Sequence, residues 1–144
     1  MQIHFLRHAT LVLTMHDLKI LVDPMLSPKD AIDPIVNSGN AIRNPMVSLP
    51  ISDEELQQVI DGLDAVLITH THGDHWDPVA QARLPKDLTL LCQPEDRAIL
   101  EQQGLQLISY FIDKHGQSMV KHSYEIEPLR ETAWHLLQNG MEMV

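Results

Sequence analysis

The first part of the chain alternates short aliphatic runs with polar breaks. Residues 3–6, 11–14 and 19–22 are aliphatic or β-branched, and this pattern predicts three short strands in an antiparallel meander. His16 and Asp17 are the expected tight turn. Five prolines fall between positions 23 and 50, so no regular structure is expected there, and a loop of this length is usually functional.

The next segment predicts helices that alternate with strands. Ser52 followed by Glu55 forms a capping box, and apolar residues then recur at helical spacing, which predicts a helix over residues 53–60. Strand, helix and strand in this order are typical of an α/β fold with a parallel portion of sheet. The later elements are expected to be a buried strand (64–69), a helix (78–83), a strand (88–92), a helix (94–103) and a strand (105–108). In the helix over 94–103, Ile99 and Leu100 are expected to face inward and Gly104 to end the helix.

Composition narrows the classes of partner. The 144 residues suffice for one domain, or part of one, and carry a formal net charge of -10. This charge argues against nucleic acid and anionic membrane surfaces, and no apolar run approaches the ~20 residues of a membrane span. Cys92 is the single cysteine, and Arg7 and His8 interrupt the apolar amino terminus, which fits no signal peptide. We therefore expect a cytoplasmic protein with a small-molecule substrate, and an anionic substrate would need the charge of a metal ion.

A cluster of candidate metal ligands follows the strand predicted to end at residue 69. His70, His72, Asp74 and His75 lie within six positions, and imidazole and carboxylate are ligands of zinc, manganese and iron. Residues two apart in an extended chain face the same side, so His70 and His72 are expected to hold one ion with parallel rings. Asp74 and His75 would then face a second ion. Two such ions can clamp a hydroxide and lower its pKa, which is hydrolytic chemistry.

This HxHxDH spacing resembles the signature of the metallo-β-lactamase superfamily. Arg7-His8-Ala9-Thr10-Leu11, Leu21-Val22-Asp23-Pro24-Met25-Leu26 and Gln93-Pro94-Glu95-Asp96 are similar to its bacterial branch of L-ascorbate-6-phosphate lactonase-like hydrolases. The resemblance implies an α/β fold, the αββα sandwich. Residues 1–107 would form the amino-terminal half of that sandwich, and residues 108–144 an atypical carboxyl-terminal tail.

The resemblance also implies the roles of the site residues. His70 and His72 would bind the first ion together with a later histidine, and Asp74 and His75 the second, with Asp74 also orienting the attacking water. Two divalent ions are expected, zinc first and manganese as the alternative. The implied activity is hydrolysis of a lactone, ester or phosphoester by a metal-bound hydroxide. The alternatives are a non-catalytic fragment that binds metal weakly or self-associates as a homo-oligomer, and an iron-dependent redox relative.

Residues around the motif allow two interpretations each. Asp23 either fixes the tautomer of a ligand histidine or merely begins the following turn. His8 either contacts substrate at the mouth of the site or is a surface histidine. Cys92, without a partner cysteine, is favoured as a small buried hydrophobe over a nucleophile. Trp76 and Asp77 are expected to be a packing anchor and a helix N-cap.

The chain after residue 107 departs from the superfamily pattern. Relatives complete the site with a histidine, a metal-bridging aspartate and a last histidine from a second αβ half. His115, His122 and His135 do not stand in the Gln-His-Gly context of the third ligand, so that role is assigned to none of them. With about two protein ligands for each ion, metal affinity should be low and turnover doubtful.

A one-nucleotide frameshift near residue 107 would explain the departure. Read one nucleotide later, codons for residues 132–136 permit Arg-His-Gly-Thr, and those for 138–142 permit Lys-Met-Gly-Trp, both similar to family segments. The competing interpretation is a short natural variant that ends in an amphipathic closing helix. That helix would carry Glu131, Trp134, Leu137 and Met141.

Resequencing the DNA across the codons for residues 105–144 and past the stop separates these two interpretations. The frameshift hypothesis expects that a one-nucleotide correction restores an open frame with His-Gly-Thr, a later aspartate and a last histidine. A frame that stands as written would leave the short natural variant.

Overall fold

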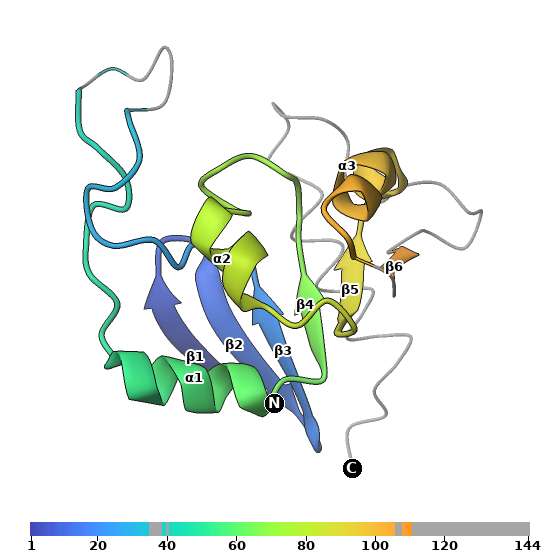
Figure 1. The fold of residues 1–144 in the computed structure, drawn as a ribbon. Helices are drawn as coiled ribbons and strands as arrows, with labels where there is room; N and C mark the ends of the chain where they lie inside the picture. Colours follow the sequence, from blue (N-terminus) through green and yellow to red (C-terminus); the bar gives the residue numbers. More distant parts are fainter. Residues whose placement is uncertain (35–38, 40, 106–107, 111–144) are drawn as a thin grey trace.

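The computed structural model describes residues 1–34, 39, 41–105 and 108–110. In this part of the chain six strands form one sheet in the order β1 to β6 (Figure 1). The antiparallel meander predicted for the amino terminus is confirmed, and His16 turns the chain with a φ of 52°. The strands are β1 (Gln2–Arg7), β2 (Thr10–Met15), β3 (Leu18–Val22), β4 (Ala65–Leu67), β5 (Thr89–Cys92) and β6 (Ile108–Tyr110).

The second part of the sheet is parallel, from β3 through β6, and a helix connects each pair of neighbouring strands. These helices are α1 (Asp53–Asp61), α2 (Pro78–Arg83) and α3 (Arg97–Gln102), the last preceded by the 3₁₀ turn η1 (Pro94–Asp96). Right-handed crossovers that advance in one direction place every helix on the same face of the sheet. Figure 1 shows α1 and α2 on one side of the sheet. The structure is therefore one αβ layer of the expected αββα sandwich.

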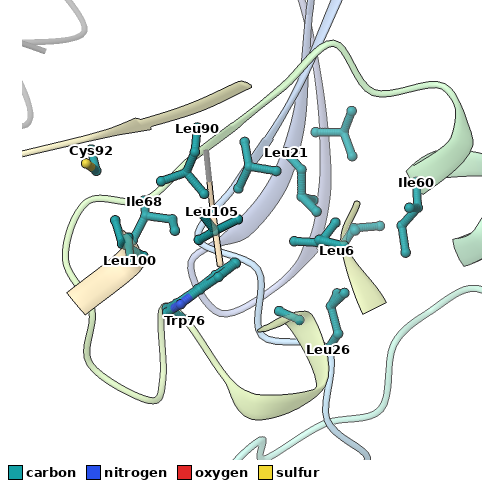
Figure 2. Packing of buried hydrophobic residues seen from close by; sticks show 14 of the residues in the cluster. Leu6, Leu21, Leu26, Ile60, Ile68, Trp76, Leu90, Cys92, Leu100 and Leu105 are labelled. Carbon is teal, nitrogen blue, oxygen red and sulfur yellow. The ribbon is translucent and has the colours of Figure 1, made fainter. Parts of the chain in front are cut away.

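The hydrophobic core lies between the sheet and this helical layer (Figure 2). Leu21, Ile68 and Leu100 are completely buried, and Trp76 is 1% exposed. The Trp76 indole N–H donates to Gln103 Oε1 at 2.8 Å, which ties the chain before α2 to the end of α3. Trp76 is thus the packing anchor that the sequence predicted. None of the described helices is long and apolar enough to cross a membrane.

Both predicted helix N-caps are confirmed. The Ser52 hydroxyl accepts from the Glu55 N–H, and the Glu55 carboxylate accepts from the Ser52 N–H, completing the capping box of α1. Asp77 caps α2 by accepting from the Ala80 N–H at 2.7 Å. The other Asp77 oxygen accepts from the Ser27 N–H at 2.6 Å, so the same buried carboxylate also fastens the long loop.

The predictions after residue 93 need correction. The expected single helix is divided into η1 and α3, and Ile99 is 46% exposed rather than inward. Gly104, with a φ of 85°, follows the end of α3 as predicted. Leu105 packs in the core and its N–H donates to the Leu100 carbonyl, so it extends the end of α3 and does not begin a strand, and the described strand that follows is β6. The predicted tail lies outside the described residues except for β6.

Candidate metal centre

The candidate site lies where β3, β4 and β5 end. The Asp23 N–H donates to the Leu67 carbonyl at 2.9 Å, and the Ile68 N–H donates to the Leu91 carbonyl at 2.8 Å. These bonds continue the parallel pairing beyond the strands, so the chain emerges at residue 69 from a fixed edge. The carboxyl ends of parallel strands are where α/β sheets bind ligands.

Asp23 is the buried centre of this edge. Its side chain is 4% exposed, and its φ of 42° lies in the left-handed region that non-glycine residues seldom adopt. The carboxylate accepts from the Thr69 N–H at 2.8 Å, from the Thr69 hydroxyl at 2.9 Å and from His75 Nδ1 at 2.9 Å. The structure therefore supports the first interpretation of Asp23, an acceptor that fixes a histidine ring.

Three of the four predicted ligands come together. His70, Asp74 and His75 each offer one donor atom, and these atoms all lie within 4.8 Å of one another. His75 Nε2 lies 3.6 Å from an Asp74 oxygen, and Thr69 Oγ1 lies 3.0 Å from His70 Nδ1. Contacts to Nδ1 leave Nε2 of each ring as the available donor. Two imidazoles and a carboxylate at this spacing suit a divalent metal ion.

The orientation of His72 differs from the prediction. Its ring centroid is 4.6 Å from that of His70, but the two rings stand at 84° rather than parallel. The reason lies in the backbone: the N–H groups of His75 and Trp76 both donate to the His72 carbonyl, so the loop turns tightly here. The two-residue alternation of an extended chain therefore does not apply. His72 is near the group of three donors without being one of them.

The pKa values of His75 and His70 are shifted in opposite directions. Burial alone would lower the pKa of His75, but its hydrogen bond to Asp23 and the charges of Asp23 and Asp74 outweigh burial and raise it. Burial lowers the pKa of His70, and the neighbouring His75 and His72 lower it further. His70 is thus the ring more readily held neutral, which is the state that a metal ligand requires.

His8 lies in the turn between β1 and β2, with a φ of 50°. Its Nε2 accepts from the Met46 N–H at 3.0 Å, which leaves Nδ1 as the protonated nitrogen of the neutral ring. Burial lowers the pKa of His8, Arg7 lowers it further, and the charge of Asp74 opposes both. His8 therefore lies within electrostatic reach of the ligand loop and holds the long loop. Its contact with substrate stays a prediction.

Several supporting residues were not identified from sequence. The buried Arg7 guanidinium donates to the carbonyls of Met25 and Ser27, and so holds the long loop beside the site. The Thr71 hydroxyl donates to Asp96 at 2.9 Å, and the Gln93 amide donates to the same carboxylate at 2.8 Å. Gln93 and Asp96 belong to a segment that the sequence singled out by resemblance alone. The structure shows that they support the ligand loop.

Thr69 was also missed as a functional residue. Its hydroxyl and N–H both bond to Asp23, and its hydroxyl contacts the rings of His70 and His75. The available signal was a hydroxyl residue directly before the first histidine. Such a residue can bond to the outer nitrogen of a ligand ring.

Comparison with known proteins identifies the family. A family model described as a β-lactamase superfamily domain matches residues 2–144. The chain belongs to the β-lactamase superfamily. UPF0173 protein YddR of Bacillus subtilis (strain 168) is 40% identical over 96 residues, which are 66% of this chain and 37% of that protein.

Two solved superfamily structures show the same fold. An isothiocyanate hydrolase from Delia radicum gut bacteria is 42% identical with a TM-score of 0.72, over 78% of this chain and 42% of the other. A possible metal-dependent hydrolase from Veillonella parvula DSM 2008 is 35% identical with a TM-score of 0.70, over 76% of this chain and 41% of the other. The chain thus spans about two fifths of the length of these relatives, and the predicted fold class is confirmed.

We expect Cys92 to be unreactive in the folded chain. Its side chain is completely buried, and burial, with the charge of Asp96, raises the pKa of the thiol to about 12. At pH 8 roughly one thiol in ten thousand would be ionised. A thiol-reactive dye should therefore label the native chain far more slowly than the urea-unfolded chain. Equal labelling rates would contradict the assignment of Cys92 as a buried hydrophobe.

Asp23→Asn should weaken metal binding by roughly 10- to 100-fold, because outer-shell partners of ligand histidines contribute that much affinity. Asparagine keeps one acceptor oxygen but loses the charge that holds both Thr69 and His75. Zinc affinity, measured by competition with a chromophoric chelator, tests this. Asp17→Asn, at an exposed turn, is the control. Unchanged affinity in a folded Asp23→Asn variant would show that Asp23 does not support metal binding.

Proposed function

We propose that this chain carries part of the metal centre of a metal-dependent hydrolase. The observation that supports this most directly is the convergence of His70, Asp74 and His75 donors within 4.8 Å, with Asp23 bonded behind His75. His72 stands beside His70 and completes the proposed ligand set. We propose two divalent ions, zinc in the first place and manganese as the alternative.

The residues have separable tasks. Bound divalent ions supply Lewis acidity and lower the pKa of a hydrolytic water. Asp23 and Thr69 fix the outer nitrogens of His75 and His70, so that each ring presents Nε2. The Asp74 side chain is 33% exposed, so water can reach its carboxylate, and Asp74 can accept a proton or a hydrogen bond from that water.

The proposed substrate is a small molecule with an electrophilic carbon or phosphorus: a lactone, an ester or a phosphoester. A solved relative is named for hydrolysing isothiocyanates, whose central carbon is also attacked by water, so that class joins the candidates. The net charge of -10 would repel an anionic substrate except at the metal ions. The same charge supports the absence of nucleic-acid and membrane partners. The single buried cysteine is compatible with the cytoplasm as the proposed compartment.

The chain spans about two fifths of the length of its relatives. Each of the residues that we propose as ligands belongs to one loop, residues 70–75. Further ligands from the rest of the domain would raise metal affinity and complete the reaction site. The alternative function is therefore a non-catalytic fragment that binds metal weakly.

Turnover and metal binding should be measured together on the purified chain with added zinc or manganese. The substrates are a lactone, a carboxylic ester, a phosphoester and an isothiocyanate. A hydrolase should show turnover that a His70→Ala/His72→Ala variant abolishes, because both rings lie in the proposed ligand set. His16→Ala, in an exposed turn, is the matched control and should keep the wild-type rate.

The remaining outcomes discriminate between the two functions. Zinc binding without turnover, lost in the double variant, would favour the non-catalytic fragment. Neither binding nor turnover in a folded chain would contradict the proposed metal centre itself.

A further inference from the structure

A pocket lies between the long loop and the start of α1. Residues 26–29, shortly after β3, form one side of it, and residues of the segment 48–53, which leads into α1, form the other (Figure 1). Its volume is about 290 Å³, close to the lower limit of small-molecule sites. The proposed metal ligands at positions 70–75 do not line it.

The pocket is lined by a buried cation, Arg7 at the end of β1, which is 1% exposed. Its guanidinium donates to the carbonyls of Met25, Ser27 and Val47, and no carboxylate of the described residues lies within ion-pair distance of it. Burial lowers the pKa of Arg7 and the charge of Asp77 opposes this, but the Asp77 oxygens accept from two backbone N–H groups instead. Since buried charges are normally paired, this guanidinium with neutral partners leaves a positive centre at the pocket wall.

Hydrogen-bond donors remain free along the pocket. The Arg7 Nη1 atom carries two N–H groups, and one of them donates to Val47, so the second has no partner among the described residues. Ser27 is only 4% exposed, and its hydroxyl bonds to no described residue. The Ser48 hydroxyl, across the loop, is likewise without a bond to the described part of the chain. A ligand with acceptor oxygens would satisfy these donors.

The rest of the pocket wall is apolar. Leu26 and Leu56 belong to the core and are 5% and 2% exposed, and Leu49 and Ile51 pack against the same core. All four side chains line the pocket. Apolar walls with a few convergent polar groups are the usual composition of a small-molecule site.

The charges at the rim of the pocket favour an anion. Lys29 lines the rim, and its exposed pair with Asp30 spans 3.9 Å, which leaves the ammonium group available to a ligand. Asp53 also lines the rim, but Arg83 Nη1 donates to its carboxylate at 2.5 Å and compensates its charge. Although the whole chain carries a net charge of -10, the pocket is therefore locally positive.

We propose that this pocket binds a small carboxylate with an apolar body. The carboxylate accepts from Arg7 and Ser27, and the body packs on the wall that contains Leu49 and Leu56. A carboxylate carries one negative charge, which matches the single buried guanidinium. A phosphate group carries nearly two negative charges and would require further buried cations.

The first test is a titration of the isotope-labelled full chain with sodium benzoate, followed by the amide shifts in NMR spectra with a metal chelator present. The proposal expects saturable shifts at residues 26–29 and 48–53, with a dissociation constant of roughly millimolar for so small a ligand. Acetate lacks the apolar body and benzyl alcohol lacks the charge, so each should bind several-fold more weakly. Equal affinity for the three compounds, or shifts confined to other residues, would overturn the proposal.

The second test changes the charge at the rim, because substitution of Arg7 would release the long loop. Lys29→Glu should weaken benzoate binding roughly fivefold. Lys19→Glu, the same change at an exposed position outside the pocket, is the matched control and should bind as the wild type does. Ser27→Ala keeps the backbone N–H that Asp77 accepts, and should weaken binding several-fold. Circular dichroism confirms that each variant is folded.

The His70→Ala/His72→Ala variant separates this pocket from the ligand loop. It should bind benzoate with the wild-type affinity, because neither ring lines the pocket. Loss of binding in this variant would place benzoate at the ligand loop and overturn the proposal. Equal loss in Lys29→Glu and Lys19→Glu would show attraction to surface charge in general, and unchanged affinity in both Lys29→Glu and Ser27→Ala would show binding elsewhere. Either result would also contradict the proposal.

Discussion

The carboxylate of Asp23 is the interaction on which the site depends. It is nearly inaccessible to water, and it accepts from Thr69 and from His75 across the ends of β3 and β4. An uncompensated charge at this depth would be strongly destabilising, so the donors must be in place whenever the chain is folded. The fold and the ring orientation of His75 are thereby coupled. Loss of this carboxylate would free the ligand loop at the point where it leaves the sheet.

Much of the architecture could be predicted because it follows from local chemistry. Short aliphatic runs separated by polar breaks predicted the meander, and the capping residues Ser52 and Asp77 predicted two helix starts. The prediction was wrong where tertiary packing decides between local options. Leu105 and Ile99 are both aliphatic, yet Leu105 is buried against the end of α3 and Ile99 faces water. Composition and spacing alone do not separate these two environments.

The candidate site, like the fold, could be predicted only in part. The types of ligand were readable from His70, His72, Asp74 and His75, because so dense a set of imidazoles and carboxylate is uncommon. Their arrangement was not readable, since two N–H groups that converge on the His72 carbonyl turn the loop and set its ring at 84° to that of His70. The partner of Asp23 was equally hidden, because it lies 52 positions away in sequence. The sequence shows which side chains could bind a metal ion, but the pairing of the parallel strands determines which of them lie close together.

The helical side of the αβ layer carries the contacts that support the ligand loop. The helical side has a continuous core and hydrogen-bonded supports for the ligand loop, including Trp76 to Gln103 and Thr71 to Asp96. These contacts come from within the described residues, so the ligand loop can be ordered before any other surface joins the layer. The consequence is that the ring orientation of His75 is set within this layer, by the contacts of Asp23 with Thr69 and with His75.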